Sequence, residues 1–299
     1  MATIHCIANP SSKEMPMNAS APTPLRYDTF VSDFTPIVGG PLPVGFPRVW
    51  SPMATTLISG KRDAVLVDPP FTLDQIQHTG DWIEKSGKRL TAIYITHGHG
   101  DHWFGAPALA HRFPGTAVYA TEGTIEIMHE QAGASREQFW DKLFPGQLPD
   151  TPVIARPIPA DGMELEGQRL HAIEVGHTDG DATTVLHVPS IGLIVAGDVA
   201  YNGVHQMLAE AAHGGLESWL RAIDTVAALQ PRAVVAGHKN KELPDTPAIL
   251  DHTRRYLLDA QRLLADKPGP TEFYETMLSL YPDHLNPATV WLSAHQLLG

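Results

Sequence analysis

The segment Thr96–Trp103 reads THGHGDHW and places four side chains that can bind a metal within six positions: His97, His99, Asp101 and His102. It directly follows an apolar run whose composition predicts a β-strand. Imidazoles and carboxylates are the ligands that hold zinc and related ions. The glycines allow a tight turn, so His97 and His99 can point one way while Asp101 and His102 begin the next helix. The spacing therefore predicts that one turn supplies ligands to two neighbouring metal ions.

Three later residues extend this pattern. His177 lies in Val175-Gly-His-Thr-Asp-Gly-Asp, Asp198 in Val195-Ala-Gly-Asp-Val, and His238 in Val235-Ala-Gly-His-Lys. Each follows an apolar run that is typical of a buried strand. Strand ends deliver side chains to a shared edge of a sheet, so we expect these three residues to meet the histidine-rich turn.

The combined pattern, His-x-His-x-Asp-His followed by a histidine, an aspartate and a last histidine, resembles the metal motif of the metallo-β-lactamase superfamily. The match covers roughly Tyr27 to Lys239. The resemblance implies two divalent metal ions, with zinc expected and iron or manganese as alternatives. The implied ligands of one ion are His97, His99 and His177, those of the other are Asp101, His102 and His238, and Asp198 bridges the two ions.

The elements around these residues predict an α/β protein. Strands at 184–188 and 193–197 are separated by a turn, Pro189-Ser-Ile-Gly, and form an antiparallel hairpin, which argues against a doubly wound parallel sheet. The resemblance implies an αββα four-layer sandwich of two mixed β-sheets flanked by helices. The expected divisions are a flexible N-terminal extension (1–25), a catalytic domain (26–245) with a helical insert (122–150), and a C-terminal helical extension packed on the same domain (246–299).

Residues near the predicted ligands are candidates for supporting roles. By family analogy, Asp101 passes a proton to the leaving group. Tyr201 follows Asp198, and some lactonases of the superfamily use a tyrosine there as a donor to the substrate oxyanion. His205 is a weaker candidate for the same role.

Three aspartates remain open or receive a structural interpretation. Asp68, in Leu66-Val-Asp-Pro, is either a carboxylate that orients a ligand histidine or a turn residue. Asp179 and Asp181, which flank Gly180, are interpreted as turn carboxylates. The aromatic residues of 103–144 are interpreted as core.

Composition restricts the partners. The 299 residues carry 21 basic and 33 acidic side chains, a net charge of −12, which disfavours binding to a nucleic acid. No apolar run approaches the roughly 20 residues of a membrane helix, and no secretory signal is visible. The single cysteine excludes an internal disulfide framework. We expect a cytoplasmic protein that acts on a small molecule, and a homodimer remains an alternative to a monomer.

The resemblance implies a zinc-dependent hydrolase that cleaves a small-molecule acyl bond, in a lactone, ester or amide-like ring, by a metal-bridging hydroxide. We expect the insert and the C-terminal helices to shape the substrate pocket. A thioesterase similar to glyoxalase II is the main alternative. A persulfide dioxygenase, a phosphodiesterase and a non-catalytic metal-binding relative are further alternatives. Asp198 stands where class B β-lactamases carry a different ligand, which disfavours antibiotic hydrolysis.

Overall fold

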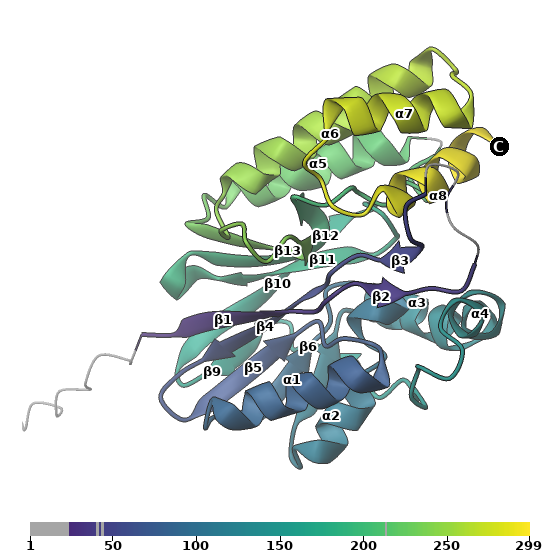
Figure 1. Ribbon diagram of the computed structural model, residues 1–299. Coiled ribbons are helices and arrows are strands. Elements are labelled where there is room, and N and C mark those ends of the chain that lie inside the picture. Colours follow the sequence, from purple (N-terminus) through teal and green to yellow (C-terminus); the bar gives the residue numbers. More distant parts are fainter. Residues whose placement is uncertain (1–23, 40–41, 43–44, 213) are drawn as a thin grey trace, which may run out of the picture.

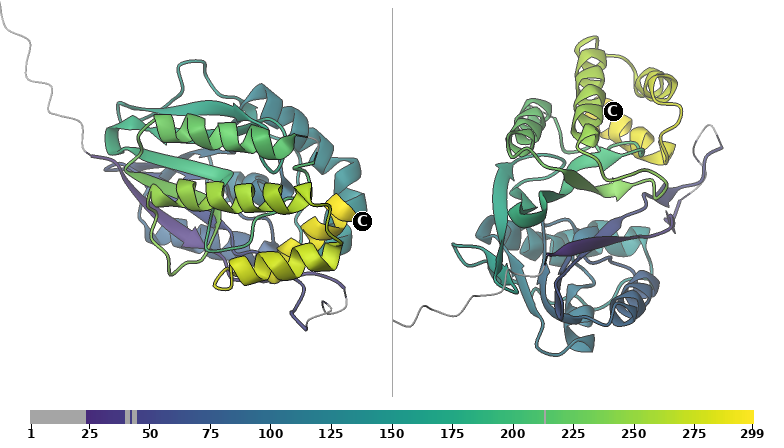
Figure 2. Two further views of the ribbon diagram at one scale, coloured as in Figure 1. Left: turned by 90° about the horizontal axis from the view of Figure 1, so that it is seen from above. Right: turned by 90° about the vertical axis from the view of Figure 1, so that its left-hand side faces the viewer.

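Short apolar segments separated by glycine, proline and aspartate form two β-sheets in the computed structural model, which describes residues 24–39, 42, 45–212 and 214–299. The sheets lie face to face, and helices cover the outer face of each (Figures 1 and 2). This arrangement confirms the αββα sandwich.

The first sheet has the strand order β1-β4-β5-β6-β7-β8. Its strands are β1 (Arg26–Val31), β4 (Ala54–Ser59), β5 (Asp63–Val67), β6 (Arg89–Tyr94), β7 (Ala117–Ala120) and β8 (Arg156–Pro157). β1, β4 and β5 pair antiparallel, whereas β5 to β8 pair parallel. A separate ribbon is formed by β2 (Thr35–Pro36) and β3 (Val49–Trp50).

The second sheet has the order β13-β12-β11-β10-β9. Its strands are β9 (Met163–Leu165), β10 (Gln168–Gly176), β11 (Thr183–Val188), β12 (Leu193–Asn202) and β13 (Ala233–Lys239). β11 and β12 form the expected antiparallel hairpin, and β12 pairs parallel with β13.

The helices fall into two groups. The first group consists of α1 (Leu73–Lys85), α2 (Ala106–Arg112), α3 (Glu122–Ala132), a π-helical turn (Arg136–Trp140) and α4 (Asp141–Leu143). The second consists of α5 (Gly215–Ala228), α6 (Ala248–Ala265), α7 (Pro270–Leu280) and α8 (Pro287–Leu298). None of the helices described is long and apolar enough to cross a membrane.

Alternating side chains along the strands build the layers. On β5, Val65 points into the cluster between the two sheets, which also contains Val195 of β12. Leu66 points the other way and packs with Ile83 of α1. On β12, Ile194 belongs to the cluster formed with α5 to α8. Successive side chains of a strand point to opposite faces of the sheet. Because both faces of each sheet are buried here, the strands are apolar on both sides.

The structure describes only the end of the N-terminal segment. The extension expected over 1–25 lies, apart from Pro24 and Leu25, outside the described residues. Leu25 is itself buried between the sheets, so the packed body begins before Tyr27.

Glu166 joins the two sheets at the end opposite the histidine-rich turn. It lies in the turn between β9 and β10, and its carboxylate accepts backbone N–H bonds from Lys61, Arg62 and Asp63 at 2.8, 2.6 and 2.9 Å. These bonds favour the ionised form and lower the pKa of Glu166 to about 2, from an ordinary value of 4.5.

Replacement of Glu166 by glutamine should lower the urea midpoint at about pH 7, because the amide cannot satisfy three donors as a carboxylate does. The folded-state pKa lies below that of the unfolded chain, so the contribution is present above about pH 4.5 and is lost as the pH falls towards 2. The difference between wild type and E166Q should therefore shrink between about pH 5 and pH 3.5. Denaturation followed by circular dichroism measures it. E164Q is the matched control, and an equal loss of stability in that variant would contradict the assignment.

Candidate metal centre

The histidine-rich turn leaves β6 and folds at once into a short 3₁₀ turn, Gly100–His102. His97, Asp101 and His102 are buried there, and His99 is partly exposed. The rings of His97 and His102 lie 4.1 Å apart between centroids, and those of His97 and His99 lie 4.9 Å apart. As expected, the four side chains of the turn converge on one small volume.

The second sheet brings Asp198 and His238 to the same volume. Nε2 of His238 lies 3.3 Å from a carboxylate oxygen of Asp101 and 3.3 Å from one of Asp198. Nε2 of His102 lies 3.3 Å from the other oxygen of Asp198. Asp198 therefore stands between the two histidines, with one oxygen facing each. Six of the seven predicted ligands come together in this way.

Two glycines make room for Asp198. Gly197 adopts a φ of +50°, and a Cβ there would lie 2.3 Å from the hydroxyl of Thr96. A Cβ on Gly237 would lie 2.0 Å from a carboxylate oxygen of Asp198. The register between β12 and β13 also shifts around Gly197. The Ala-Gly-Asp and Ala-Gly-His sequences are thus required by close packing at the site.

His177, the seventh predicted ligand, is not brought to this group. Nδ1 of His177 lies 2.7 Å from the carboxylate of Asp181, and Nε2 lies 3.1 Å from the backbone oxygen of Glu210. Each ring nitrogen of His177 thus lies against an oxygen outside the cluster formed by the other six residues. Its position in this structure therefore departs from the expectation.

Asp179 occupies the place beside His97 and His99. Ligand atoms of these three residues lie within 4.8 Å of one another. Nδ1 of His99 lies 3.2 Å from Asp179, and Nε2 of His99 lies 3.5 Å from the carboxylate of Glu210. Asp179 is buried, so its interpretation as a plain turn carboxylate is corrected too. The pair of carboxylates around Gly180 was the sequence feature that could have indicated a ligand here. Spacing alone did not decide which of the two side chains points towards the cluster.

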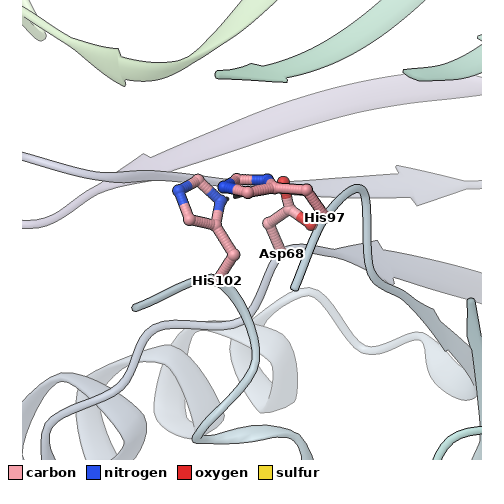
Figure 3. A group of neighbouring side chains, drawn as sticks. All are labelled: Asp68, His97 and His102. Carbon is pink, nitrogen blue, oxygen red and sulfur yellow. Dashed lines mark hydrogen bonds and ion pairs between the residues drawn. The ribbon is translucent and has the colours of Figure 1, made fainter. Parts of the chain in front are cut away.

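Asp68 orients two of the histidines (Figure 3). Its carboxylate accepts from the backbone and the hydroxyl of Thr96, at 2.8 and 2.7 Å, and lies 3.1 Å from Nδ1 of His102. Because the Thr96 hydroxyl donates to Asp68, it accepts from Nδ1 of His97, 3.1 Å away. Because Nδ1 of each ring is engaged in this way, Nε2 is the atom that each ring directs at the cluster. Of the two interpretations of Asp68, the structure supports the orienting role.

The unpaired atoms of the cluster fit metal ions. Among the described residues, Nε2 of His97, Nε2 of His102 and one oxygen of Asp198 are buried without a hydrogen-bond partner. Neighbouring donors of a tetrahedral shell with bonds of about 2.0–2.1 Å lie about 3.3 Å apart. The separations of 3.2 Å for His99 and Asp179, and of 3.3 Å for His102 and Asp198, match this edge. The mixed nitrogen and oxygen donors suit zinc, manganese or iron.

The charges in the cluster depend on one another. Burial opposes ionisation of Asp198, but the imidazoles of His238 and His102 outweigh it and hold its pKa well below the ordinary value. Burial likewise opposes protonation of His238, yet Asp198 and Asp101 raise its pKa to about 10. Burial lowers the pKa of His97, which keeps this ring neutral and able to bind a cation. The cluster thus has the negative field that a bound cation neutralises.

Two aromatic residues touch the carboxylates. The indole N–H of Trp50 donates to Asp101 at 2.7 Å, and the hydroxyl of Tyr201 donates to Asp198 at 2.7 Å. Trp50 was missed because it lies 51 positions before Asp101 and has no local motif. His205 is bonded to Tyr256 instead, at 3.0 Å, and is buried away from these carboxylates.

A cavity of about 380 Å³ opens onto the cluster. Its apolar wall comes from Trp50 of β3, Phe139 and Trp140 of the π-helical turn, Met207, and Leu292 of α8. Of the residues that the structure describes, no lysine or arginine lines it. Phe139, which we interpreted as core, is exposed and is therefore a pocket residue, whereas Trp140 belongs to the core as expected and also contributes to the pocket wall.

Replacement of Asp68 by asparagine should weaken metal binding about 10- to 100-fold, because the amide cannot accept from both Thr96 and His102. Titration calorimetry with Zn²⁺ on the metal-depleted protein measures the affinity. D74N, on the exposed face of α1, is the matched control. Equal affinities of D68N and wild type would show that Asp68 is only a turn residue.

Comparison with known proteins agrees with this arrangement. The sequence profile of the Metallo-beta-lactamase superfamily matches residues 49–238. A metallo-beta-lactamase family protein from Thermus thermophilus is 21% identical, with a TM-score of 0.60 over 90% of this chain and 91% of that one. A metallo-beta-lactamase from Pontibacter korlensis is 19% identical, with a TM-score of 0.57 over 80% of this chain and 97% of that one. Comparison with curated proteins gave no match. Since the profile spans most of the chain and the fold agrees, this protein belongs to the metallo-β-lactamase superfamily.

Proposed function

We propose that this protein is a metal-dependent hydrolase that cleaves the acyl bond of a small uncharged molecule, such as a lactone, an ester or an amide-like ring. The observation that carries the proposal is the cluster of unpaired imidazole and carboxylate atoms, which lies at the base of an apolar cavity. Members of the superfamily are largely metal-dependent hydrolases, and zinc is the metal that we expect.

The ligand groups define where the chemistry takes place. When bound, two divalent cations supply Lewis acidity and lower the pKa of a coordinated water towards neutrality. His102, His238, Asp101 and Asp198 would hold one of them, and His97 and His99 would contribute to the other. No nucleophilic side chain is needed, which agrees with the lack of a cysteine among the described residues that line the cavity.

Tyr201 and Asp101 are the side chains suited to handle protons. Burial and the neighbouring Asp198 raise the pKa of Tyr201 well above its ordinary value, so its hydroxyl stays a donor at neutral pH. It lines the cavity and can reach a substrate oxygen. Asp101, which accepts the indole N–H of Trp50, remains the candidate to protonate the leaving group.

The cavity lining supports an uncharged substrate. The thioester substrate of glyoxalase II carries the carboxylates of glutathione, and phosphodiesters carry a phosphate. Binding such anions normally uses arginine or lysine, and neither lines the described part of this cavity. Glu210 stands at its rim and would repel an anion. The thioesterase and phosphodiesterase alternatives are therefore less favoured than a lactonase or esterase.

A substrate panel tests the proposal. Neutral lactones and esters with apolar chains should show a kcat/KM at least about 10-fold above that of S-lactoylglutathione, because the cavity buries apolar surface and its described lining has no lysine or arginine. The activity of D198N should be more than about 100-fold below that of wild type. Replacement of a residue that only hydrogen-bonds to a metal ligand already costs up to about 100-fold, and Asp198 is a predicted ligand itself. Discontinuous or coupled assays on the zinc-loaded enzyme measure the kcat/KM of each substrate and the activity of D198N. A preference for the glutathione thioester would overturn the substrate class.

Removal of the Tyr201 hydroxyl should lower kcat about 100-fold, the lower end of the loss seen when one oxyanion donor is removed. The metal content of Y201F, measured by mass spectrometry, should equal that of wild type, since the ring still packs against His238. Y256F, which removes a buried hydroxyl bonded to His205 instead, is the control. An unchanged kcat in Y201F would exclude a role for this hydroxyl in the reaction.

A further inference from the structure

We propose that Asp179 is a metal ligand of this protein, in place of His177, so that the first metal site is formed by His97, His99 and Asp179. The inference rests on the metal centre of the proposed function and concerns one position within it. It departs from the ligand set that the superfamily resemblance implies, which has a third histidine at this site.

Asp179 is held in the orientation that a ligand needs. The hydroxyl of Thr178 donates to one of its carboxylate oxygens at 3.1 Å, and the other oxygen faces Nδ1 of His99 at 3.2 Å. The hydroxyl of Thr178 is in turn 3.0 Å from that of Thr183, on the first residue of β11. The loop that follows β10 thus presents one carboxylate oxygen to the cluster from a fixed position.

The position after Asp179, Gly180, has no room for a side chain. A Cβ on Gly180 would lie 2.8 Å from the ring of His99. The backbone of the loop therefore approaches His99 directly, and the short aspartate side chain is enough to reach the site. The unpaired Nε2 of buried His97 completes the set of donors.

His177 is engaged elsewhere in the same loop. Its two ring nitrogens lie 2.7 Å from a carboxylate oxygen of Asp181 and 3.1 Å from the backbone oxygen of Glu210. The ring also packs against the first turn of α5, because a Cβ on Gly215 would lie 2.9 Å from its Nε2. His177 therefore joins the loop after β10 to the segment that carries Glu210. It positions the rim of the cavity and does not bind the ion.

The exchange of an imidazole for a carboxylate has a chemical consequence. An anionic oxygen replaces a neutral nitrogen, so the bound cations retain one unit less positive charge. Carboxylate oxygen also favours manganese and iron relative to an all-imidazole site. The first site of this protein should accept these harder ions more readily than a site with three histidines does.

Metal retention in matched variants tests the assignment. Metal-depleted wild type, D179N and H177A are loaded with Zn²⁺, dialysed against a weak chelator and analysed by mass spectrometry. Wild type and H177A should retain about two ions per chain, and D179N about one, with an affinity for the second ion at least about 100-fold lower. Circular dichroism of the metal-free proteins checks folding. D179H, which supplies another ligand at the same position, should recover the second ion.

The outcomes separate the two proposals. Retention of both ions by D179N at unchanged affinity, or loss of one ion in H177A alone, would overturn the assignment of Asp179 and leave the metal centre intact. Wild type that binds no metal would overturn the proposed function itself. The visible spectrum of the Co²⁺-loaded proteins provides a second readout: it should change in D179N and stay unchanged in H177A.

Discussion

The structure depends on positive charge that compensates the negative charge of three carboxylates buried beside one another. Asp101, Asp179 and Asp198 are each about 2% exposed and share their surroundings with imidazoles. Buried anions are costly unless paired, and here the positive charge comes from protons on rings such as His238, whose pKa is raised to about 10. Metal cations can supply the same compensation, with lone pairs of the imidazoles directed at them. The network thus acts as a stable part of the core and as a site for chemistry.

The site requires both sheets at a fixed separation. The first sheet provides the histidine-rich turn and Asp68, and the second provides Asp198 and His238. Thr184 of β11 holds them together directly behind the site: its backbone N–H and its hydroxyl both donate to the backbone oxygen of Thr96, at 2.9 and 2.6 Å, and its hydroxyl lies 2.7 Å from that of Tyr94. These bonds explain how residues about 140 positions apart keep the spacing of a coordination shell.

Reaction and specificity have separate structural origins. The metal-binding side chains come from the sheets, whereas the cavity walls come from the helical insert and from α8. The expectation that these segments shape the pocket agrees with Phe139 and Leu292 among its lining residues. Changes in such segments alter the substrate without disturbing the ligands, which is how one fold supports many reactions. The apolar lining, in which the described residues include no lysine or arginine, is therefore the feature that narrows the substrate of this particular chain.

The sequence by itself determined the fold and most of the metal centre, because these depend on local patterns: the alternation of the strands, the β11–β12 hairpin and the THGHGDHW turn. Only the tertiary structure placed Asp179 beside His97 and His99, with His177 outside that group, and only it placed Trp50 on Asp101. The register of β10 against β11 shifts between Glu174 and Gly176, and such a shift changes which of the following side chains face the site. No local pattern records that bulge, and contacts between distant segments arise only when the sheets pack.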